Sequence, residues 1–489
     1  MSSNMDDFFA DPSHRPQSFH VSHWCAEPYS QGAWSQLCVG GTPSDRTQLG
    51  SKVSDNFIIA GEATSAGMAA MVNGAAETGI YAATQMCSPE NSTDSIFSCA
   101  NDSDCADHDV IVIGAGTAGV FAARKTKELL TAQGRPDASV VLLEARDRIG
   151  GRIHTVDMTL PGDGEAVRVD LGATWLQQYP NNIVADIIRT EDTGLEVVPT
   201  DFSTALCSTD AGVPPFRDLN RILDAGDYYV SKAMENADTD RSLADVLLEY
   251  IDTLPESQRF LAHLSIGGDV VADLGYDLFD TSARHGLEEL GVGNDDHYIK
   301  QGYGAILEYL SKGLDIRLQT AVEVVNYTNP LLVRLQLKGG QVITAQRCIC
   351  TTPVAVMRNK TISFVPELPP AHLGALGRIQ QGRCEKVLLR FNTRWWPVCN
   401  GTADGNGMLR WYDTSRYPEH AVRRSEFPML LDYVEWLDMT DGLGVPVVMG
   451  FCVGKQAVAR FHVGTDKEIA TNAALAFEKW AWYMKQNMA

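Results

Sequence analysis

The sequence predicts a mixed α/β protein with more than one domain, organised around a parallel sheet. The first observation is the strand–helix–strand pattern of residues 109–144, which reads "DVIVIG", then "TAGVFAARKTKELLTAQG" up to Gly134, then "ASVVLLEA". Strands that alternate with helices favour parallel pairing. The second observation is the length of 489 residues, which exceeds the usual size of a single hydrophobic core.

A glycine motif follows the first of these strands. Gly114, Gly116 and Gly119 form G-x-G-x-x-G at the start of the helix, and Glu144 ends the second strand. The glycines permit a tight turn and bring the backbone close to a pyrophosphate at the helix N-terminus, and the glutamate accepts hydrogen bonds from ribose hydroxyls. Since strand, helix, second strand and acidic residue are all in order, the segment predicts a dinucleotide site.

The residues after Glu144 favour FAD over NAD. In "EARDRIGGRIHT" the pair Gly150 and Gly151 lies between Arg146 and Arg152. This second glycine pair and its flanking arginines would bring further backbone N–H groups and positive charge to the diphosphate. A plain NAD-binding domain does not need these additional groups. The segment 169–182, "VDLGATWLQQYPNN", then predicts a strand that runs into a Gly-Ala turn.

A second strand–turn–helix pattern stands upstream of the first. Residues 56–79, "NFIIAGEATSAGMAAMVNGAAETG", read as an apolar strand, a Gly61–Glu62 turn and a helix of small residues. Residues 87–108 between the two patterns are rich in Ser, Asp and Asn, which predicts a linker.

Composition limits the possible partners and location. The chain is 44% hydrophobic and 21% charged, and its net charge of −22 disfavours nucleic acid and anionic membranes as partners. The same charge would attract a cationic substrate or serve solubility alone. No apolar run reaches about 18 residues and no signal-peptide core is visible, so we expect a cytoplasmic protein.

The cysteines predict neither a metal site nor a disulfide framework. Eleven are scattered along the chain, no C-x-x-C pair occurs, and only Cys348 and Cys350 lie close together.

Taken together, these motifs resemble the flavin-containing amine oxidases, which include polyamine oxidases, monoamine oxidases and related histone demethylases. Residues 298–327 resemble the return of that family's chain to its FAD domain, and 348–397 resemble its entry into the substrate domain. The resemblance implies a Rossmann-like FAD-binding domain interleaved with a substrate domain of mixed sheet plus helices. It also implies oxidation of an amine C–N bond by hydride transfer to flavin N5, with O2 reoxidising the flavin to give H2O2.

The order of the motifs implies a circular permutation of that fold. The stretch at 57–83 resembles a segment that lies near the C-terminus of the family, and 23–35, "HWCAEPYSQGAWS", resembles its usual prelude. The C-terminal residues resemble the helix that normally precedes that prelude. The expected parts are 1–86, 107–200, 301–350 and a packing helix at 457–489 for the FAD-binding domain, 87–106 for the linker, and 201–300 (helices) and 351–456 (sheet) for the substrate domain.

The resemblance also implies where the reaction takes place. Lys386, in "GRCEKVLLRF", matches a lysine that holds a water next to flavin N5, although a strand lysine that faces solvent is the alternative. Trp34 matches one aromatic wall of the substrate site, whereas the second wall is Met71, which is not aromatic. Gln177 stands where polyamine oxidases often place Glu or His. Ala33 replaces the cysteine that bonds to flavin in monoamine oxidases, so FAD is expected to be non-covalent.

The remaining expected contacts belong to the cofactor. Glu62 is expected to accept a bond from the ribityl chain, and Val322 is expected to contact the adenine through its backbone. The full set of expected FAD-binding residues is Gly114, Gly116, Gly119, Glu144, Ala145, Arg146, Gly151, Arg152, Gly172, Ala173, Thr174, Val322, Gly61, Glu62, Met71 and Val72.

Two alternatives to an amine oxidase stay open. Met71 and Gln177 favour a dehydrogenase or oxidative cyclase that acts on a bulky nitrogenous metabolite. A flavin-containing binding protein without turnover is the alternative from another class.

Overall fold

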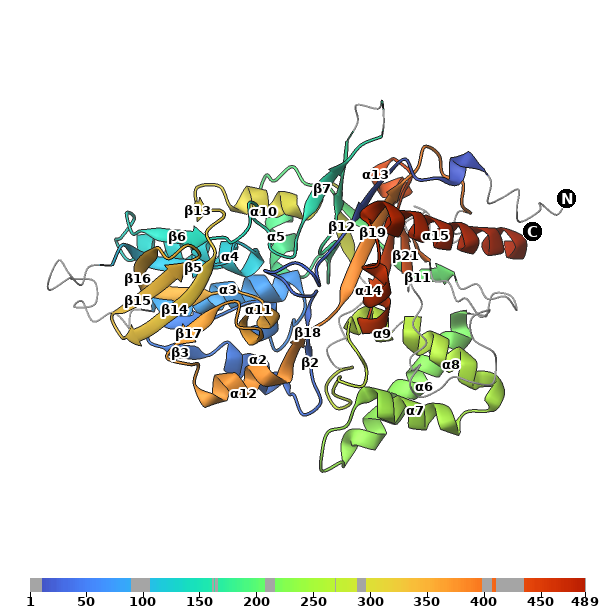
Figure 1. Cartoon of the computed structure of the whole chain (residues 1–489), viewed down its shortest axis with the longest axis horizontal. Helices are drawn as coiled ribbons and strands as arrows, with labels where there is room; N and C mark the ends of the chain where they lie inside the picture. The colour runs from blue at the N-terminus through green and yellow to red at the C-terminus, as the bar shows by residue number, and fades with distance from the viewer. Residues whose placement is uncertain are drawn as a thin grey trace.

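The computed structural model describes residues 11–88, 106–160, 162, 166–206, 216–268, 270–287, 296–397, 407–409 and 435–488. These residues form two large sheets, one on the left and one on the right of Figure 1. Most of the expected linker 87–106 and part of the expected sheet segment 351–456 lie outside the described residues.

The first sheet contains five parallel strands that confirm the predicted α/β class. Their order is β13 (Asp315–Arg317), β6 (Val140–Leu143), β5 (His108–Ile113), β16 (Val342–Cys350) and β4 (Phe57–Ile59). Strands β6 and β4 are wholly apolar and buried, as expected where a sheet is covered on both faces, whereas the edge strand β13 carries Asp315 and Arg317.

The upstream segment completes this sheet. Cys348 of β16 pairs with Ile111 of β5 on one side and with Phe57 of β4 on the other. The helix after β4, α3 (Val72–Cys87), packs against α4 (Thr117–Ala132), the helix after β5, and Figure 1 shows the two side by side. Residues 57–87 are therefore part of the dinucleotide fold.

Close approach of these two helices depends on small residues. A Cβ added at Gly79 of α3 would lie 2.2 Å from the carbonyl oxygen of Ala118 in α4. Ala76, Ala82 and Ala83 of α3 are completely buried on the same helix. The small-residue pattern of the sequence thus reflects helix–helix contact.

Further strands extend the same sheet. Strand β15 (Leu332–Leu337) is antiparallel to both β16 and β14 (Val322–Asn329), β17 (Ser363–Val365) is parallel to β14, and β3 (Lys52–Ser54) is antiparallel to β4. Helices α2 (Pro43–Leu49), α11 (Val354–Arg358) and α12 (Pro370–Arg378) contribute to the apolar cluster on this part of the sheet.

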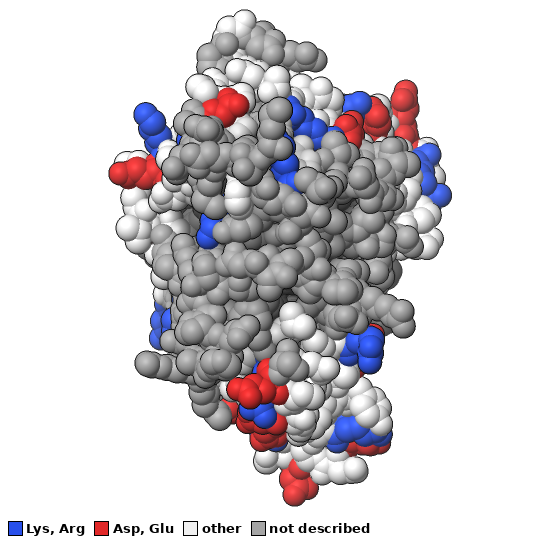
Figure 2. Space-filling model, turned by 90° about the vertical axis from the view of Figure 1, so that its right-hand side faces the viewer, with Lys and Arg blue, Asp and Glu red and all other residues white. Residues whose placement is uncertain are grey.

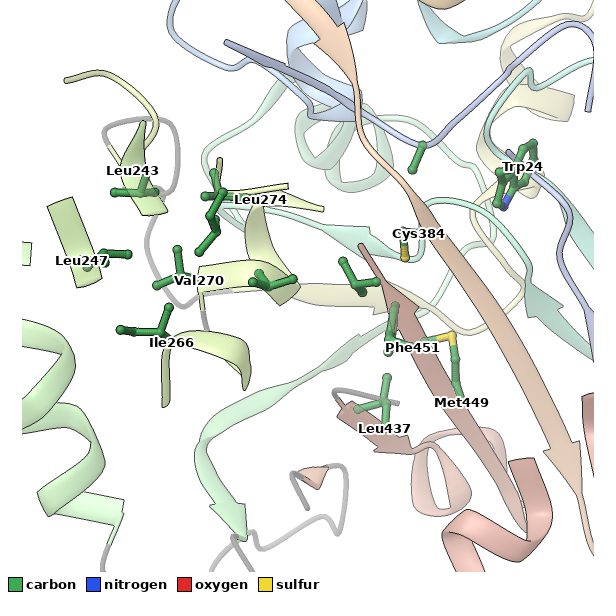
Figure 3. Packing of buried hydrophobic residues seen from close by; sticks show 14 of the residues in the cluster. Trp24, Leu243, Leu247, Ile266, Val270, Leu274, Cys384, Leu437, Met449 and Phe451 are labelled. Carbon is green, nitrogen blue, oxygen red and sulfur yellow. The ribbon is translucent and has the colours of Figure 1, made fainter. Parts of the chain in front are cut away.

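The second sheet is mixed and has the order β1 (Ser18–Val21), β19 (Cys384–Arg390), β22 (Val447–Val453), β21 (Glu435–Asp438), β20 (Gly407–Leu409) and β11 (Asp201–Leu206). Helices α6 (Phe216–Glu235), α7 (Leu243–Thr253), α8 (Glu256–Gly268) and α9 (Val270–Leu274) lie beside it. Figure 3 shows Leu247 and Ile266 from these helices in one cluster with Met449 and Phe451 from β22.

Three expected boundaries are wrong. Strand β1 and the C-terminal helix α15 (Asp466–Met488) were both expected on the FAD-binding half, but β1 pairs with β19 and α15 packs on β1 and β19. Residues 354–378 were expected in the substrate half, but their helices and β17 join the first sheet. Phe477 and Trp480 of α15 are fully buried in the second half, and the sequence pattern could not say which sheet that apolar face would cover.

The remaining described elements are short. The small strands are β2 (Ser35–Leu37), β7 (Thr155–Met158), β8 (Val167–Asp170), β9 (Trp175–Leu176), β10 (Val197–Pro199), β12 (His297–Ile299) and β18 (Ile379–Gln381). The small helices are η1 (Pro12–His14), η2 (Glu62–Thr64), α5 (Ile183–Thr190), α10 (Gly304–Leu310), α13 (Thr440–Leu443) and α14 (Lys455–Phe461).

Within the described part of the chain, no helix combines the length and apolar character needed to cross a bilayer. On the face shown in Figure 2, the acidic and basic side chains of described residues lie next to one another at the top and at the bottom. The net charge of −22 is therefore not gathered into one acidic field among the residues visible there.

Candidate active site

A cavity of about 590 Å³ is lined by residues of both halves. The expected site residues that line it are Gly61, Glu62, Met71, Val72, Gly114, Gly116, Glu144, Ala145, Arg146, Gly151, Arg152, Gly172, Ala173, Thr174, Val322, Trp34, Gln177 and Lys386. Gly119 is the exception. A Cβ there would lie 1.8 Å from the carbonyl oxygen of Gly114, so this glycine is needed for the close packing of helix on strand.

The glycine-rich turn presents backbone to the cavity. Gly114 has φ +98°, a conformation that favours glycine, and Gly116 pairs in parallel with Gly150. Gly116 is also the N-cap of α4. The turn thus directs the positive end of a 16-residue helix towards the space between the two glycine pairs.

Glu144 is fixed at the end of β6. It is 3% exposed, and its carboxylate accepts hydrogen bonds from the backbone N–H groups of Ala115 (2.8 Å) and Arg146 (2.9 Å). These bonds hold the carboxylate at the cavity wall, where it can accept further hydrogen bonds from a ribose.

Arg146 and Arg152 are engaged within the protein. Arg146 pairs with Glu27 and donates to Ser30 Oγ at 2.6 Å, and Arg152 donates to Glu62 at 2.8 Å. Their charges are therefore largely balanced by glutamates, and a direct contact of either guanidinium with a diphosphate stays a prediction.

Glu62 is the centre of a buried network beneath the cavity. It accepts hydrogen bonds from Ser35 Oγ (2.6 Å), from the Ala70 N–H (3.0 Å) and from Arg152. Burial opposes its ionisation, but Arg152 and Arg46 outweigh burial, so the pKa of Glu62 lies below its ordinary value. Glu62 is therefore a carboxylate that fixes the turn between β4 and α3, and its bond to a ribityl chain remains a prediction.

Lys386 faces the interior and not solvent, which decides against the alternative of a surface lysine. It is 5% exposed, and its Nζ donates to the carbonyl oxygen of Gly172 and, at 2.7 Å, to Thr174 Oγ1. Nζ also lies 5.0 Å from the ring centre of Phe451 and 5.5 Å from that of Trp175. Burial lowers the pKa of Lys386 to about 8.

The aromatic lining was only partly foreseen. Trp34 lines the cavity as expected, and its indole N–H donates to the Leu274 carbonyl at 3.0 Å. Trp175 and Phe451, which were not expected, stack with ring centres 5.3 Å apart. The strand register aligns Lys386 with Phe451, and Phe451 with Glu435, so that all three face the cavity.

The missed residues carry a faint sequence signal. Trp175 stands within "GATWLQQ", and Phe451 and Glu435 lie in the segment 351–456 that was expected to form the sheet of the substrate domain. The partner of each strand was not visible, however, and the face that meets the cavity depends on that pairing.

The described residues contain no group of three or more His, Cys, Asp or Glu side chains arranged to hold a metal ion. Cys348 and Cys350 are both completely buried in β16.

The family comparison decides the identity of the fold. The model of the family "Flavin containing amine oxidoreductase" matches residues 4–87 and 118–442, which is most of the chain. The chain belongs to this family.

Individual members of the flavin-containing amine oxidoreductases are similar over part of the chain. The "Probable polyamine oxidase 4" of Arabidopsis thaliana is 28% identical over 316 residues, covering 59% of this chain and 59% of that protein. The human "Lysine-specific histone demethylase 2" is 27% identical over 378 residues, covering 74% of this chain and 42% of that protein. The chain thus spans about 59% of the length of this polyamine oxidase and less than half of the demethylase.

A solved structure supports the fold. A double mutant of putrescine oxidase, described as a structure-based redesign of cofactor binding, aligns with a TM-score of 0.53 and 19% identity. The alignment covers 78% of this chain and 82% of that one.

The residues of the cavity fit the flavin of this family. Gly114, Gly116 and Gly151 line the cavity at the N-terminus of α4, and Glu144 lies at the second strand end, where a dinucleotide ribose is bound in Rossmann folds. A Cβ at Gly61 would meet no atom within 4 Å, so space for a ligand also exists at the β4–α3 turn. These parts of the cavity lining come from residues 61–72 and 114–152.

Proposed function

We propose that the protein is an FAD-dependent oxidoreductase that oxidises a C–N bond of an amine, with O2 as the final electron acceptor. The observation that carries the proposal is the position of Lys386. It is a buried lysine in the second sheet that lines the same cavity as the glycine-rich turn and Glu62 of the first sheet. A dinucleotide site without redox chemistry has no need of such a lysine.

The protein residues orient the substrate and control its surroundings. When bound, the flavin would accept a hydride from the carbon next to the amine nitrogen and pass the electrons to O2, so that the imine product hydrolyses to a carbonyl compound and H2O2 forms. Trp34, Trp175 and Phe451 supply apolar walls that exclude water. Lys386, with its pKa lowered to about 8 by burial, holds a water or a proton on the cavity side of these walls.

Two residues of the cavity lining bear on the class of substrate. Met71 and Gln177 line the cavity and carry no charge. They keep open a dehydrogenase or oxidative cyclase with a bulky nitrogenous substrate, because neither side chain pairs ionically with a small cationic amine.

The decisive experiment is a peroxide assay with a panel of primary, secondary and bulky tertiary amines. Peroxide with any amine supports an oxidase. Anaerobic bleaching of the flavin without peroxide indicates a dehydrogenase or cyclase, and a flavin that no amine bleaches in stopped-flow measurements would leave only a binding protein.

The mode of cofactor attachment is tested on the same preparation. Because Ala33 offers no thiol, acid or heat precipitation is expected to release intact FAD into the supernatant. Yellow colour retained on the washed polypeptide contradicts this expectation.

A further inference from the structure

The turn formed by residues 172–174 provides two fixed acceptors for the amine of Lys386. The Gly172 carbonyl and Thr174 Oγ1 both accept from Nζ, the latter at 2.7 Å, and Thr174 is 1% exposed. The turn itself is tightly held, since a Cβ at Gly172 would lie 1.8 Å from the Arg152 carbonyl oxygen.

The turn occupies two of the three hydrogen-bonding positions on Nζ and leaves the third position open. A charged lysine has three N–H donors, and a neutral lysine has two N–H donors and one lone pair. The turn accepts two N–H groups in either state. The remaining position is therefore an N–H donor in the charged state and a lone-pair acceptor in the neutral state. Since Lys386 lines the cavity, this position is available to a group in the cavity.

We propose that Thr174 is a positioning residue, whose hydroxyl fixes Lys386 so that the third position of its nitrogen serves the cavity in both protonation states. The lysine can then give or take a proton without moving its side chain. The expected effect of Thr174 on turnover rests on the proposed amine oxidation. Its expected effect on the protonation of Lys386 does not.

Other ionisable groups also surround Lys386 and stay unchanged when Thr174 is replaced. Asp170 of β8 and Cys384, two residues earlier on β19, both act on it electrostatically, and Glu435 of β21 lines the same cavity. Burial raises the pKa of the Cys384 thiol to about 12 and that of Asp170 to about 6. Around pH 8 the thiol is neutral and Asp170 is charged, so neither titrates together with the lysine in the wild-type protein.

The test is a pH titration by NMR of protein labelled with ¹³C at the lysine ε-carbons, in which the Lys386 signal is assigned by its loss in Lys386→Met. Thr174→Val keeps the shape but removes the acceptor. Because the lost bond favoured the charged amine, the midpoint is expected to fall by about one to two pH units. Thr174→Ser restores the acceptor and the midpoint. The control is Thr126→Val, because Thr126 is a fully buried threonine of α4 that does not line the cavity. This variant is expected to leave the midpoint unchanged.

Two results would overturn the proposal. One is an unchanged midpoint in Thr174→Val, and the other is a serine variant that behaves like the valine variant. If Thr174→Val does not fold, Thr174→Ala, which adds no atom, carries the same expectation. In an active enzyme the pH–rate limb of Lys386 moves with the midpoint. If no amine is oxidised, the NMR result stands alone, so failure of the proposed function is distinguished from failure of the positioning role.

Discussion

At the residue scale, Lys386 shows how one side chain depends on partners far away in the sequence. Its acceptors come from residues 172–174 and its aromatic neighbours from β9 and β22. An isolated buried ammonium would be strongly disfavoured, so these contacts are what permit a lysine here at all. The lysine is therefore placed by the meeting of the two halves and not by its own strand.

Replacing Lys386 by methionine should separate folding from catalysis. Lys386→Met is expected to fold and to bind FAD, because methionine fills a similar volume without a buried charge. Turnover is expected to fall by about 10- to 1000-fold, the scale for one positioned catalytic group. Stopped-flow measurements of flavin reduction and reoxidation will show which half-reaction slows, and equal rates for variant and wild type in both would mean that the lysine has been misassigned.

The same variant has a defined effect on pH-dependent stability. Lys386 has a folded-state pKa of about 8, whereas an unfolded lysine titrates near about 10.4. Between these values the unfolded chain binds more protons, so the contribution of Lys386 to the free energy of unfolding rises with pH. Denaturant titrations from about pH 7 to 10.5 should show this rise in wild type and in the control Lys52→Met, a half-buried lysine of β3, but not in Lys386→Met.

Much of the cofactor half could be predicted at the residue scale. The glycines, Glu144 and Glu62 follow strand ends, and local sequence fixes where a strand ends and what chemistry follows it. The aromatic pair Trp175 and Phe451 could not be predicted, because stacking requires β9 and β22 to meet across the cavity. Likewise, the pairing of Arg152 with Glu62 joins residues 90 positions apart.

At the element scale, helix α3 is the least replaceable part of the upstream segment. It packs on β4 and α4, and Met71 and Val72 at its start line the cavity together with Gly61 and Glu62 of the preceding turn. Its contact with α4 leaves no room for a methyl group at Gly79. Packing of this helix and geometry of the cavity are therefore coupled.

Substituting Gly79 by alanine should disturb both. The new methyl group would lie 2.2 Å from the Ala118 carbonyl oxygen, and the two helices must separate to admit it. We expect a loss of about 1–3 kcal/mol in the free energy of unfolding, together with weaker FAD binding. Thermal unfolding and flavin content measure the two effects.

Gly377→Ala is the matched control. Gly377 lies in α12, where an added Cβ meets no atom within 4 Å. Alanine favours a helix over glycine by about 0.5–1 kcal/mol, so this variant should be at least as stable as wild type. Equal stability of both glycine variants would show that the α3–α4 contact tolerates separation.

At the scale of the whole molecule, the order of the segments is the unusual feature. The cavity-lining segment 61–72 precedes the cavity-lining segment 114–152 in the chain, although the family resemblance places the first of these segments near the C-terminus. The N-terminal region is tied to the last helix, since His14 and Arg15 contact the buried Glu478 of α15 at 3.0 and 2.7 Å. Figure 1 shows η1 beside α15. We infer that the chain is a circular permutant of the family fold.

A pair of rearranged proteins tests this inference. Deleting residues 1–106 removes β1, β4, the Glu62 turn and α3, which exposes Ile349, Val112 and the face of α4 that α3 covers. That loss exceeds the roughly 5–15 kcal/mol by which domains are stable, so the product should be insoluble or free of flavin.

Joining residue 489 to residue 1 and opening the chain within 87–106 instead keeps every core contact. About ten residues follow Glu478 in α15, a helical length of about 15 Å, and the ten residues before Asp11 can reach about 33 Å, so a short linker is sufficient. This second protein should fold, bind FAD and match the activity of the original chain, because the contacts among the described core residues stay the same. A yellow, active deletion protein would show that residues 57–87 are dispensable, and the inference would then be abandoned.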